Sequence, residues 1–196
     1  MSNDSSVAGF LSPTSAYPYD SGLDQIFHDM LAGIVGITGD LVRPRWQPEP
    51  PTQPPFDTNW IAFGVSKIKP DTFAYIGHDP NGDGGLGADV VERDERLDVL
   101  VSFIGPQPST LLNMLIDGLQ VGQNRDQLWT FGITLVEFSE PTMVPALTQE
   151  KWVKRMDTTG TFRRRTARGY NINNIQSAQA TIYVSSGMTY QINVNQ

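Results

Sequence analysis

The chain has 196 residues and a mass of 21.7 kDa, which is enough for one compact domain with a hydrophobic core, or for one domain with extended arms. Its 14 basic and 21 acidic residues give a formal net charge of −7, the wrong sign for a protein that neutralises nucleic-acid phosphates. Because the chain has no cysteine, disulfide scaffolds, cysteine-ligated metal centres and thiol catalysis are excluded.

The N-terminal part of the chain predicts an arm followed by a helix. Residues 1–19 are rich in Ser, Thr and Pro, which predicts an extended arm, and they lack the basic start and apolar core of a secretory signal. No later window approaches the 18 apolar residues of a membrane span, so we expect no membrane partner. Apolar residues three and four apart between Leu23 and Val35 predict an amphipathic helix, with Asp20 and Ser21 as candidate caps and an end near Gly36.

A proline-rich segment and a pair of strands are expected next. Arg43 to Pro55 contains six prolines in thirteen residues, which predicts a semi-rigid strap of extended backbone. Alternating apolar residues predict a strand over Asn59 to Lys69, and residues 73–76 are expected to pair back against it. Ala88 to Ile104 has the longest strand pattern, with one apolar face and one charged face.

The remaining elements follow the same reasoning. Helical spacing between Gln107 and Val121 predicts a second helix that Ser109 or Thr110 caps and Gly122 ends. After it we expect a helical turn at 124–129, a short strand at 133–138 and an edge piece at 144–147. A long strand at 152–166 and a hairpin at 178–194, with its turn at 185–187, complete the chain.

This order of elements predicts an α+β fold with an antiparallel or mixed β-sheet, helices packed on one face, an extended N-terminal arm and a C-terminal β-hairpin. We expect three parts: the arm at 1–19, the α+β domain at 20–170 and the hairpin extension at 171–196.

A loop rich in Gly and Asp, from His78 to Asp89, matches two motifs in part. Its glycines have the spacing of a dinucleotide fingerprint, but a strand, and not the required helix, is expected after it. Asp79, Asn81 and Asp83 match the first half of a calcium loop, but Val90 stands where a bidentate Glu is required. The loop is therefore a solvated hairpin loop or a weak candidate for a non-standard cation site, and we predict no cofactor.

Catalytic constellations are absent from the sequence. No nucleophile elbow, P-loop or zinc-protease motif occurs, and neither His28 nor His78 stands in a sequence that indicates a nucleophile and its base. Asp94 and Glu95 are expected to point to opposite faces of a strand, so they cannot share a substrate proton. We predict that the protein is not an enzyme.

The distribution of charge indicates a possible contact surface. Residues 151–169 contain seven basic residues and one acidic residue, a net charge of +6, whereas the rest of the chain contains seven basic and 20 acidic residues, a net charge of −13. A basic strand on an acidic body is typical of head-to-tail contacts between copies. The alternative is a solvated strand whose arginines pair internally with Glu92, Asp94, Glu95 or Asp98.

Four stretches carry a resemblance to a known family: LVRPRWQPEPPTQPP, NWIAFGV, ADVVERDERLDVLVSFIGP and DGLQVGQNRDQLW. Together they resemble the tail-terminator or neck-terminator (collar) proteins of tailed bacteriophages, over roughly Leu23 to Arg168. The resemblance implies a structural virion protein, assembled in the host cytoplasm and located in the neck. It would form a homo-oligomeric ring, usually hexameric, that caps the tail tube, halts polymerisation of the tube and any sheath, and contacts the head connector.

The expected contact residues lie on the strap and on the basic strand. They are Arg43, Arg45, Trp46, Lys154, Arg155, Arg163, Arg164, Arg165 and Arg168. Replacement of Arg163, Arg164 and Arg165 by Glu is predicted to abolish the ring and leave the monomer folded. Trp46 is equally well interpreted as a lid over the sheet. The hairpin and the arm could reach a neighbour by strand addition, and DNA would pass through an acidic lumen without specific binding.

Two other functions remain open from the sequence. One is a head-to-tail completion protein on the portal side, which would also form a ring, and the other is a calcium-dependent binding module. A completion protein would co-purify with the portal, whereas a terminator would co-purify with the tail tube. A calcium-dependent melting temperature would identify the binding module.

Overall fold

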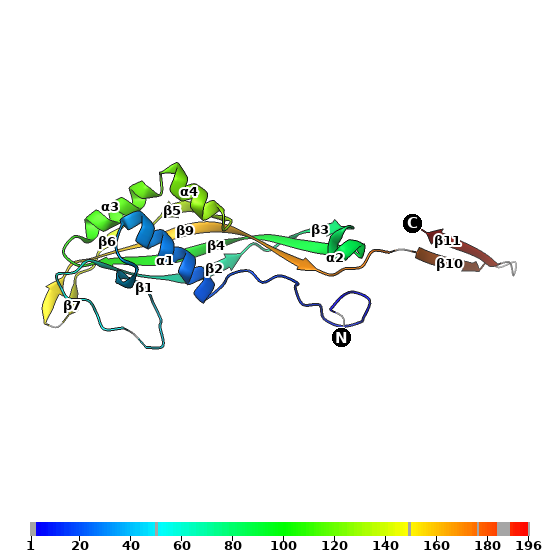
Figure 1. Ribbon diagram of the computed structural model, residues 1–196, viewed down its shortest axis with the longest axis horizontal. Coiled ribbons are helices and arrows are strands. Elements are labelled where there is room, and N and C mark those ends of the chain that lie inside the picture. Colours follow the sequence, from blue (N-terminus) through cyan, green and yellow to red (C-terminus); the bar gives the residue numbers. More distant parts are fainter. Residues whose placement is uncertain (1–2, 50, 149, 176, 184–188, 196) are drawn as a thin grey trace. The chain divides into compact units, whose positions relative to one another are not determined.

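The computed structural model describes residues 3–49, 51–148, 150–175, 177–183 and 189–195 (Figure 1). The chain divides into two compact units. The larger comprises Tyr17–Ala74 and Glu92–Thr166, and the smaller comprises Met1–Ala16, Tyr75–Val91 and Ala167–Gln196. Among the described residues, no helix has both the length and the apolar character needed to span a bilayer.

The larger unit is built on a mixed sheet. Its strands are β1 (Val42–Pro44), β2 (Trp60–Pro70), β4 (Ala88–Ile104), β9 (Arg155–Tyr170) and β5 (Ile133–Phe138), in that spatial order. β1 runs parallel to β2, whereas β2 and β4, and likewise β5 and β9, are antiparallel. The short strand β6 (Thr142–Met143) also pairs with β9, and β7 (Ala146–Thr148) pairs with β8 (Lys151–Val153).

Three helices cover one face of this sheet: α1 (Ser21–Val35), α3 (Pro108–Gly118) and α4 (Gly122–Trp129) (Figure 1). A 3₁₀ turn, η1 (Gly39–Leu41), joins α1 to β1. The core lies between the helices and the sheet, where Phe27 of α1 meets Phe162 of β9 with ring centroids 5.0 Å apart. The fold class predicted from the sequence is thereby confirmed.

The predicted helices and strands differ from the structure at their ends. Gly36 adopts the left-handed conformation that ends α1, as expected, but Asp20 makes no side-chain cap bond. α3 begins at Pro108 with Gln107 as its N-cap, because a proline at the first helical position loses no hydrogen bond, so the expected caps Ser109 and Thr110 were wrong. α3 ends at Gly118, and Gly122, the expected terminator, instead begins α4.

Two strand predictions also need correction. Residues 73–76 were expected to pair with the strand at 59–69, but β3 (Tyr75–Asp79) pairs with β4 instead. The strand expected at 152–166 is divided into β8 and β9 at Lys154, where the backbone oxygen of Lys154 accepts a hydrogen bond from Gly105 at 3.1 Å.

The smaller unit contains β3, the start of β4, the end of β9 and a four-residue helical turn, α2 (Gly82–Gly85). The N-terminal arm contacts the end of β9 through a bridge between Asp4 and Asn171 and through the Thr14 N–H, which donates to Gly169 O at 2.8 Å. β10 (Ser177–Tyr183) and β11 (Thr189–Asn195) form the predicted antiparallel hairpin. Its expected turn at 185–187 lies outside the described residues.

Candidate interface site

The arginines of the basic strand are divided between the two faces of the sheet. In β9 the even-numbered side chains from Thr158 to Thr166 are buried under the helices, whereas Arg163 and Arg165 project from the opposite face. This alternation is the period of two that any strand imposes on its side chains. Three arginines adjacent in sequence therefore have two different environments.

Arg164 is fully buried and paired within its own subunit. Its Nε donates to Glu95 Oε1 at 2.7 Å, and its Nη1 donates to the Pro18 carbonyl oxygen at 2.6 Å. The Nη2 nitrogen also contacts Glu95 Oε1, but it is not aligned to donate a hydrogen bond. The guanidinium lies 4.5 Å from the ring centroid of Tyr19 and 5.2 Å from that of Tyr17. Arg164 was predicted as a contact residue, but its burial removes it from the surface of the folded chain.

The Arg164 site also fixes the start of α1. The Tyr19 hydroxyl donates to Glu95 Oε2 at 2.9 Å, and the Tyr17 hydroxyl donates to the Arg165 carbonyl oxygen at 2.8 Å. Together with the Pro18 bond, these contacts hold residues 17–19 against β4 and β9. Arg164 therefore stabilises the path of the chain from the N-terminal arm into α1.

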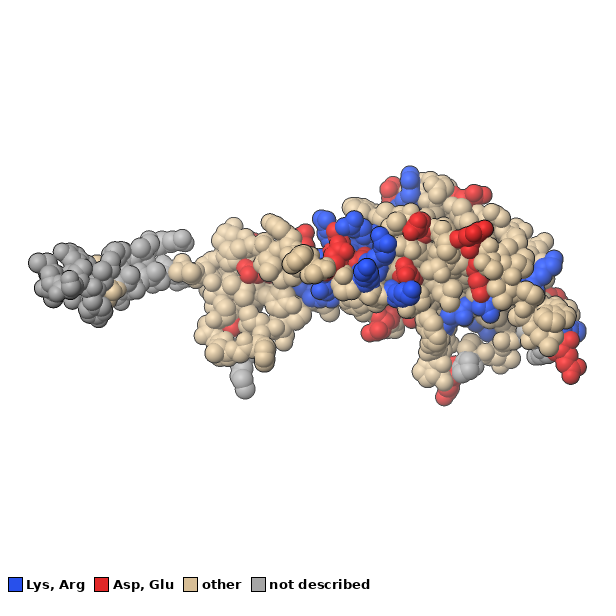
Figure 2. Space-filling view, turned by 180° about the vertical axis from the view of Figure 1, so that it is seen from behind, with Lys and Arg blue, Asp and Glu red and all other residues tan. Residues whose placement is uncertain are grey.

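Arg163 and Arg165 converge on Asp94 at the exposed face. Arg163 Nη2 lies 2.9 Å from Asp94 Oδ2, and Arg165 Nε lies 3.2 Å from Asp94 Oδ1. The hydrogen bond from Arg165, followed by that from Arg163, lowers the pKa of Asp94 and keeps this carboxylate charged. Both arginines remain more than 60% exposed at their side chains. Figure 2 shows basic and acidic side chains intermixed on the surface that is seen from behind.

A second polar cluster lies on the same face, beneath the strap. Arg155 donates two hydrogen bonds of 2.7 Å to the carboxylate of Asp157, and Asp157 accepts a third from the buried hydroxyl of Ser102. Arg45 completes the cluster by donating to the same hydroxyl. Burial lowers the pKa of Arg45, with the nearby charge of Arg155 acting in the same direction, but the guanidinium stays charged.

Trp46 lies on the sheet but remains exposed. Its backbone has a φ of +59°, an unusual value for a bulky residue, and its ring rests on Gly64 of β2, where a Cβ would come within 2.5 Å of Trp46 Cζ3. The residue as a whole is nevertheless 69% exposed. Trp46 thus acts partly as the lid considered from the sequence while presenting an apolar surface to solvent.

The other predicted contact residues are distributed around these clusters. Arg43 holds the strap through hydrogen bonds to the carbonyl oxygens of Asp40 and Thr52 at 2.9 and 2.6 Å. Lys154 is exposed at the junction of β8 and β9, and Arg168 is half-buried in the smaller unit.

The loop with the weak cation motif at Asp79, Asn81 and Asp83 is held by local hydrogen bonds. The Asp79 side chain accepts a hydrogen bond from the Asn81 N–H at 3.0 Å, and Asp83 and Gly84 have positive φ. Within the described ranges, no three side chains of His, Cys, Asp or Glu lie close enough together to hold a metal ion. The carbonyl oxygens of Pro80 and Gly85 in this loop accept hydrogen bonds from the side-chain amide of Asn174.

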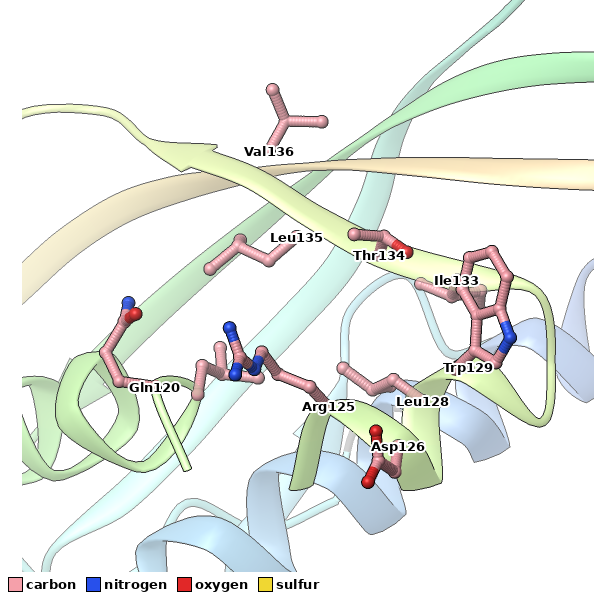
Figure 3. A pocket seen from close by; sticks show the side chains of 10 residues that line it. Gln120, Arg125, Asp126, Leu128, Trp129, Ile133, Thr134, Leu135 and Val136 are labelled. Carbon is pink, nitrogen blue, oxygen red and sulfur yellow. The ribbon is translucent and has the colours of Figure 1, made fainter. Parts of the chain in front are cut away.

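Sequence reasoning missed the groove beside the edge strand β5 (Figure 3). The groove has a volume of about 340 Å³ and runs between β5 and α4, where Leu135 and Leu128 contribute apolar surface and Arg125 and Asp126 contribute opposite charges. Two other exposed apolar residues, Leu147 and Trp152, are cross-strand neighbours in the β7–β8 hairpin.

Comparison with known proteins places the chain in a family. A search of individually curated proteins finds no match. A search of protein families matches residues 21–187 to the family described as phage neck terminator protein. The matched region contains all the helices, the whole mixed sheet and both polar clusters. The chain therefore belongs to the phage neck terminator family, whose members are structural proteins of the phage neck and not a family of enzymes.

Proposed function

We propose that this neck protein assembles into a homo-oligomeric ring that caps the tail tube, ends its polymerisation and joins the tail to the head connector. The match of residues 21–187 to the neck terminator family is the observation that carries this proposal. It also favours a terminator over the alternative of a completion protein on the portal side.

Features of the surface support self-association. Trp46, Leu147 and Trp152 are each more than 60% exposed, and exposed tryptophan side chains like the first and third commonly anchor protein interfaces. They lie on the strap and on the β7–β8 hairpin, away from the helices that cover the sheet. A subunit with different surfaces for its two neighbours makes head-to-tail contacts, and these close into a ring when the rotation permits.

The proposed electrostatic contact uses the exposed members of the basic strand. Arg163 and Arg165 each carry donors beyond those bound to Asp94, so they can also bind a carboxylate of a neighbouring copy. Lys154, which follows β8, is a further exposed basic residue. Arg164 is left out because it is buried against Glu95.

The structure changes the design of the charge-reversal experiment. Replacing all three arginines by Glu would place a second carboxylate beside buried Glu95, so the monomer would not stay folded as first predicted. The double substitution Arg163→Glu with Arg165→Glu avoids this problem. The control, Lys67→Glu with Lys69→Glu, makes the same change of charge at exposed positions of β2.

Ring formation is measured by light scattering and negative-stain electron microscopy. A hexamer would have a mass of about 130 kDa, six times 21.7 kDa, and we expect the wild type and the control to reach it. The Arg163/Arg165 variant should stay at monomer mass with an unchanged circular dichroism spectrum. Rings that persist in this variant would refute the electrostatic contact. A wild type that remains monomeric even on added tail tubes would refute the ring itself.

A binding experiment tests the two partners in this proposal, the tail tube and the head connector. Purified tail tubes and purified head connectors are incubated separately with the protein and sedimented. Binding to the end of the tube with arrest of its growth is the expected result for a terminator. Binding to the connector alone would refute termination and favour the portal-side role.

A further inference from the structure

The C-terminal hairpin has unsatisfied strand edges. β10 and β11 pair with each other from Ser177 with Asn195 to Tyr183 with Thr189, and neither has another partner strand within the described part of the chain. An isolated two-stranded hairpin is marginally stable in water, because it has no third strand or helix to pack against. The hairpin therefore needs a surface beyond its own two strands.

The hairpin also lacks the features that normally protect strand edges. Residues 171–196 contain no Lys, Arg, Asp, Glu or Pro, so all 35 charged residues of the chain lie before this segment. Natural edge strands usually carry charges or prolines that prevent pairing with other chains. An uncharged hairpin can also approach an acidic copy of the same chain without electrostatic repulsion.

The chain is anchored just before the hairpin. The Asn174 N–H donates to the Leu86 carbonyl oxygen at 2.7 Å, and its side-chain amide donates to the Pro80 oxygen at 2.9 Å. The Asn174 Oδ1 atom lies 2.9 Å from His78 Nε2. This residue is three positions before β10, so the Gly and Asp loop holds the root of the hairpin and reduces the entropy lost when the hairpin docks.

The larger unit offers an unpaired strand edge of matching length. β5 pairs with β9 alone among the described strands, so its other edge is open beside α4. It has six residues without proline, and each hairpin strand has seven. The adjoining groove in Figure 3 can receive alternate side chains of an added strand, with Leu135 and Leu128 on its walls.

We propose that the β10–β11 hairpin of one copy adds to the β5 edge of a second copy, with alternate side chains in the groove between β5 and α4. The choice of a second copy as the occupant rests on the proposed ring. A donor and an acceptor at different places on one chain make a head-to-tail contact, the type that closes into a ring.

The cysteine-free sequence permits a direct crosslinking test. One preparation carries Val136→Cys on the exposed side of β5, and a second, tagged preparation carries Thr181→Cys in β10 or Gln191→Cys in β11. These two hairpin positions are cross-strand partners, so either order of strand addition is covered. After mixing and mild oxidation, we expect a crosslinked heterodimer with at least one hairpin variant, at ten times or more the yield of a Met114→Cys control on α3.

A truncation gives a second, independent readout. Removal of residues 176–196 should leave the melting temperature of the larger unit unchanged and shift the mass from ring to monomer. Rings at the wild-type yield after this truncation, or crosslinks no stronger than with the Met114→Cys control, would overturn the hairpin proposal while leaving the ring intact. Crosslinked heterodimers of the cysteine variants, together with a wild type that forms no ring, would support the hairpin contact and refute the ring.

Discussion

The buried pair of Arg164 and Glu95 gives the sharpest test of how this domain is stabilised. Both side chains are at most 1% exposed, and Arg164 Nε donates to Glu95 Oε1 at 2.7 Å. The substitution Glu95→Gln keeps the size of the side chain and removes its charge. It leaves a guanidinium without a counter-charge in the core, where the Pro18 carbonyl oxygen and the faces of Tyr17 and Tyr19 remain to stabilise it.

The expected loss follows from this geometry. Removing one partner of a buried ion pair costs about 3–5 kcal/mol, because the remaining charge stays desolvated. Domains of this size have unfolding free energies of about 5–15 kcal/mol, so the loss is a large fraction of the total. At about 2–4 °C per kcal/mol, the melting temperature should fall by roughly 10 °C.

Urea unfolding followed by tryptophan fluorescence and circular dichroism measures the change. The exposed pair supplies the matched control, since Asp94→Asn removes a carboxylate of the same strand and should cost about 1 kcal/mol or less. The double substitution Glu95→Leu with Arg164→Met replaces the pair with apolar side chains and should recover most of the stability lost in Glu95→Gln. A Glu95→Gln variant no less stable than Asp94→Asn would refute the reasoning.

Two further predictions concern close contacts outside this pair. Gly64→Ala should displace the ring of Trp46 and lower the free energy of unfolding by about 1–3 kcal/mol. The control Gly33→Ala, whose Cβ meets no neighbouring atom, should not lower it. Thermal unfolding compares the two variants, and equal losses would contradict the contact between Gly64 and Trp46. The hydrogen bond between His78 and Asp89 raises the pKa of His78. The stability that protonated His78 contributes is therefore complete below about pH 6.5 and is lost as the pH rises through the raised pKa. NMR titration should show Asp89→Asn lowering this pKa, and an unchanged value would contradict the assignment.

Periodicity predicted most of the secondary structure, because the larger unit buries one face of each element. The apolar spacing between Leu23 and Val35 corresponds to α1, and the alternation between Leu97 and Phe103 corresponds to the buried face of β4. The same alternation predicted that Asp94 and Glu95 point to opposite faces, and their separate arginine partners confirm it.

The burial of Arg164 shows where reasoning from local charge was insufficient. Counting basic residues along the segment grouped the three arginines as one contact surface, whereas the alternative of internal pairs with acidic residues named both Asp94 and Glu95, which the structure shows as their partners. Glu95 has the same parity as Leu97 and Val99, so its place on the buried face was a usable signal for an internal partner. The partner itself comes from β9, 69 positions later in the chain, and no local pattern specifies that pairing.

The Gly and Asp loop was difficult to interpret for a related reason. Its composition suggested a cation loop or a solvated turn, but its carbonyl oxygens at Pro80 and Gly85 accept hydrogen bonds from Asn174, about ninety positions away. Gly87 has a φ of +110°, and a Cβ there would come within 2.6 Å of the Ile172 oxygen. The glycine is therefore required for a close backbone approach that a motif search does not detect.

Most arginines of the basic strand form ion pairs within the subunit. Only the donors that stay exposed can bind a neighbouring copy. Glu95 neutralises Arg164, Asp157 binds Arg155, and Asp94 is shared by Arg163 and Arg165. A contact with a neighbour at this strand therefore competes with existing ion pairs and gains less than the net charge of the segment suggests. An added strand has no such competition, because its backbone groups exchange water alone for a partner. In the proposed ring, this difference is the physical reason to expect that the uncharged hairpin contributes more to holding the copies together than the arginines do.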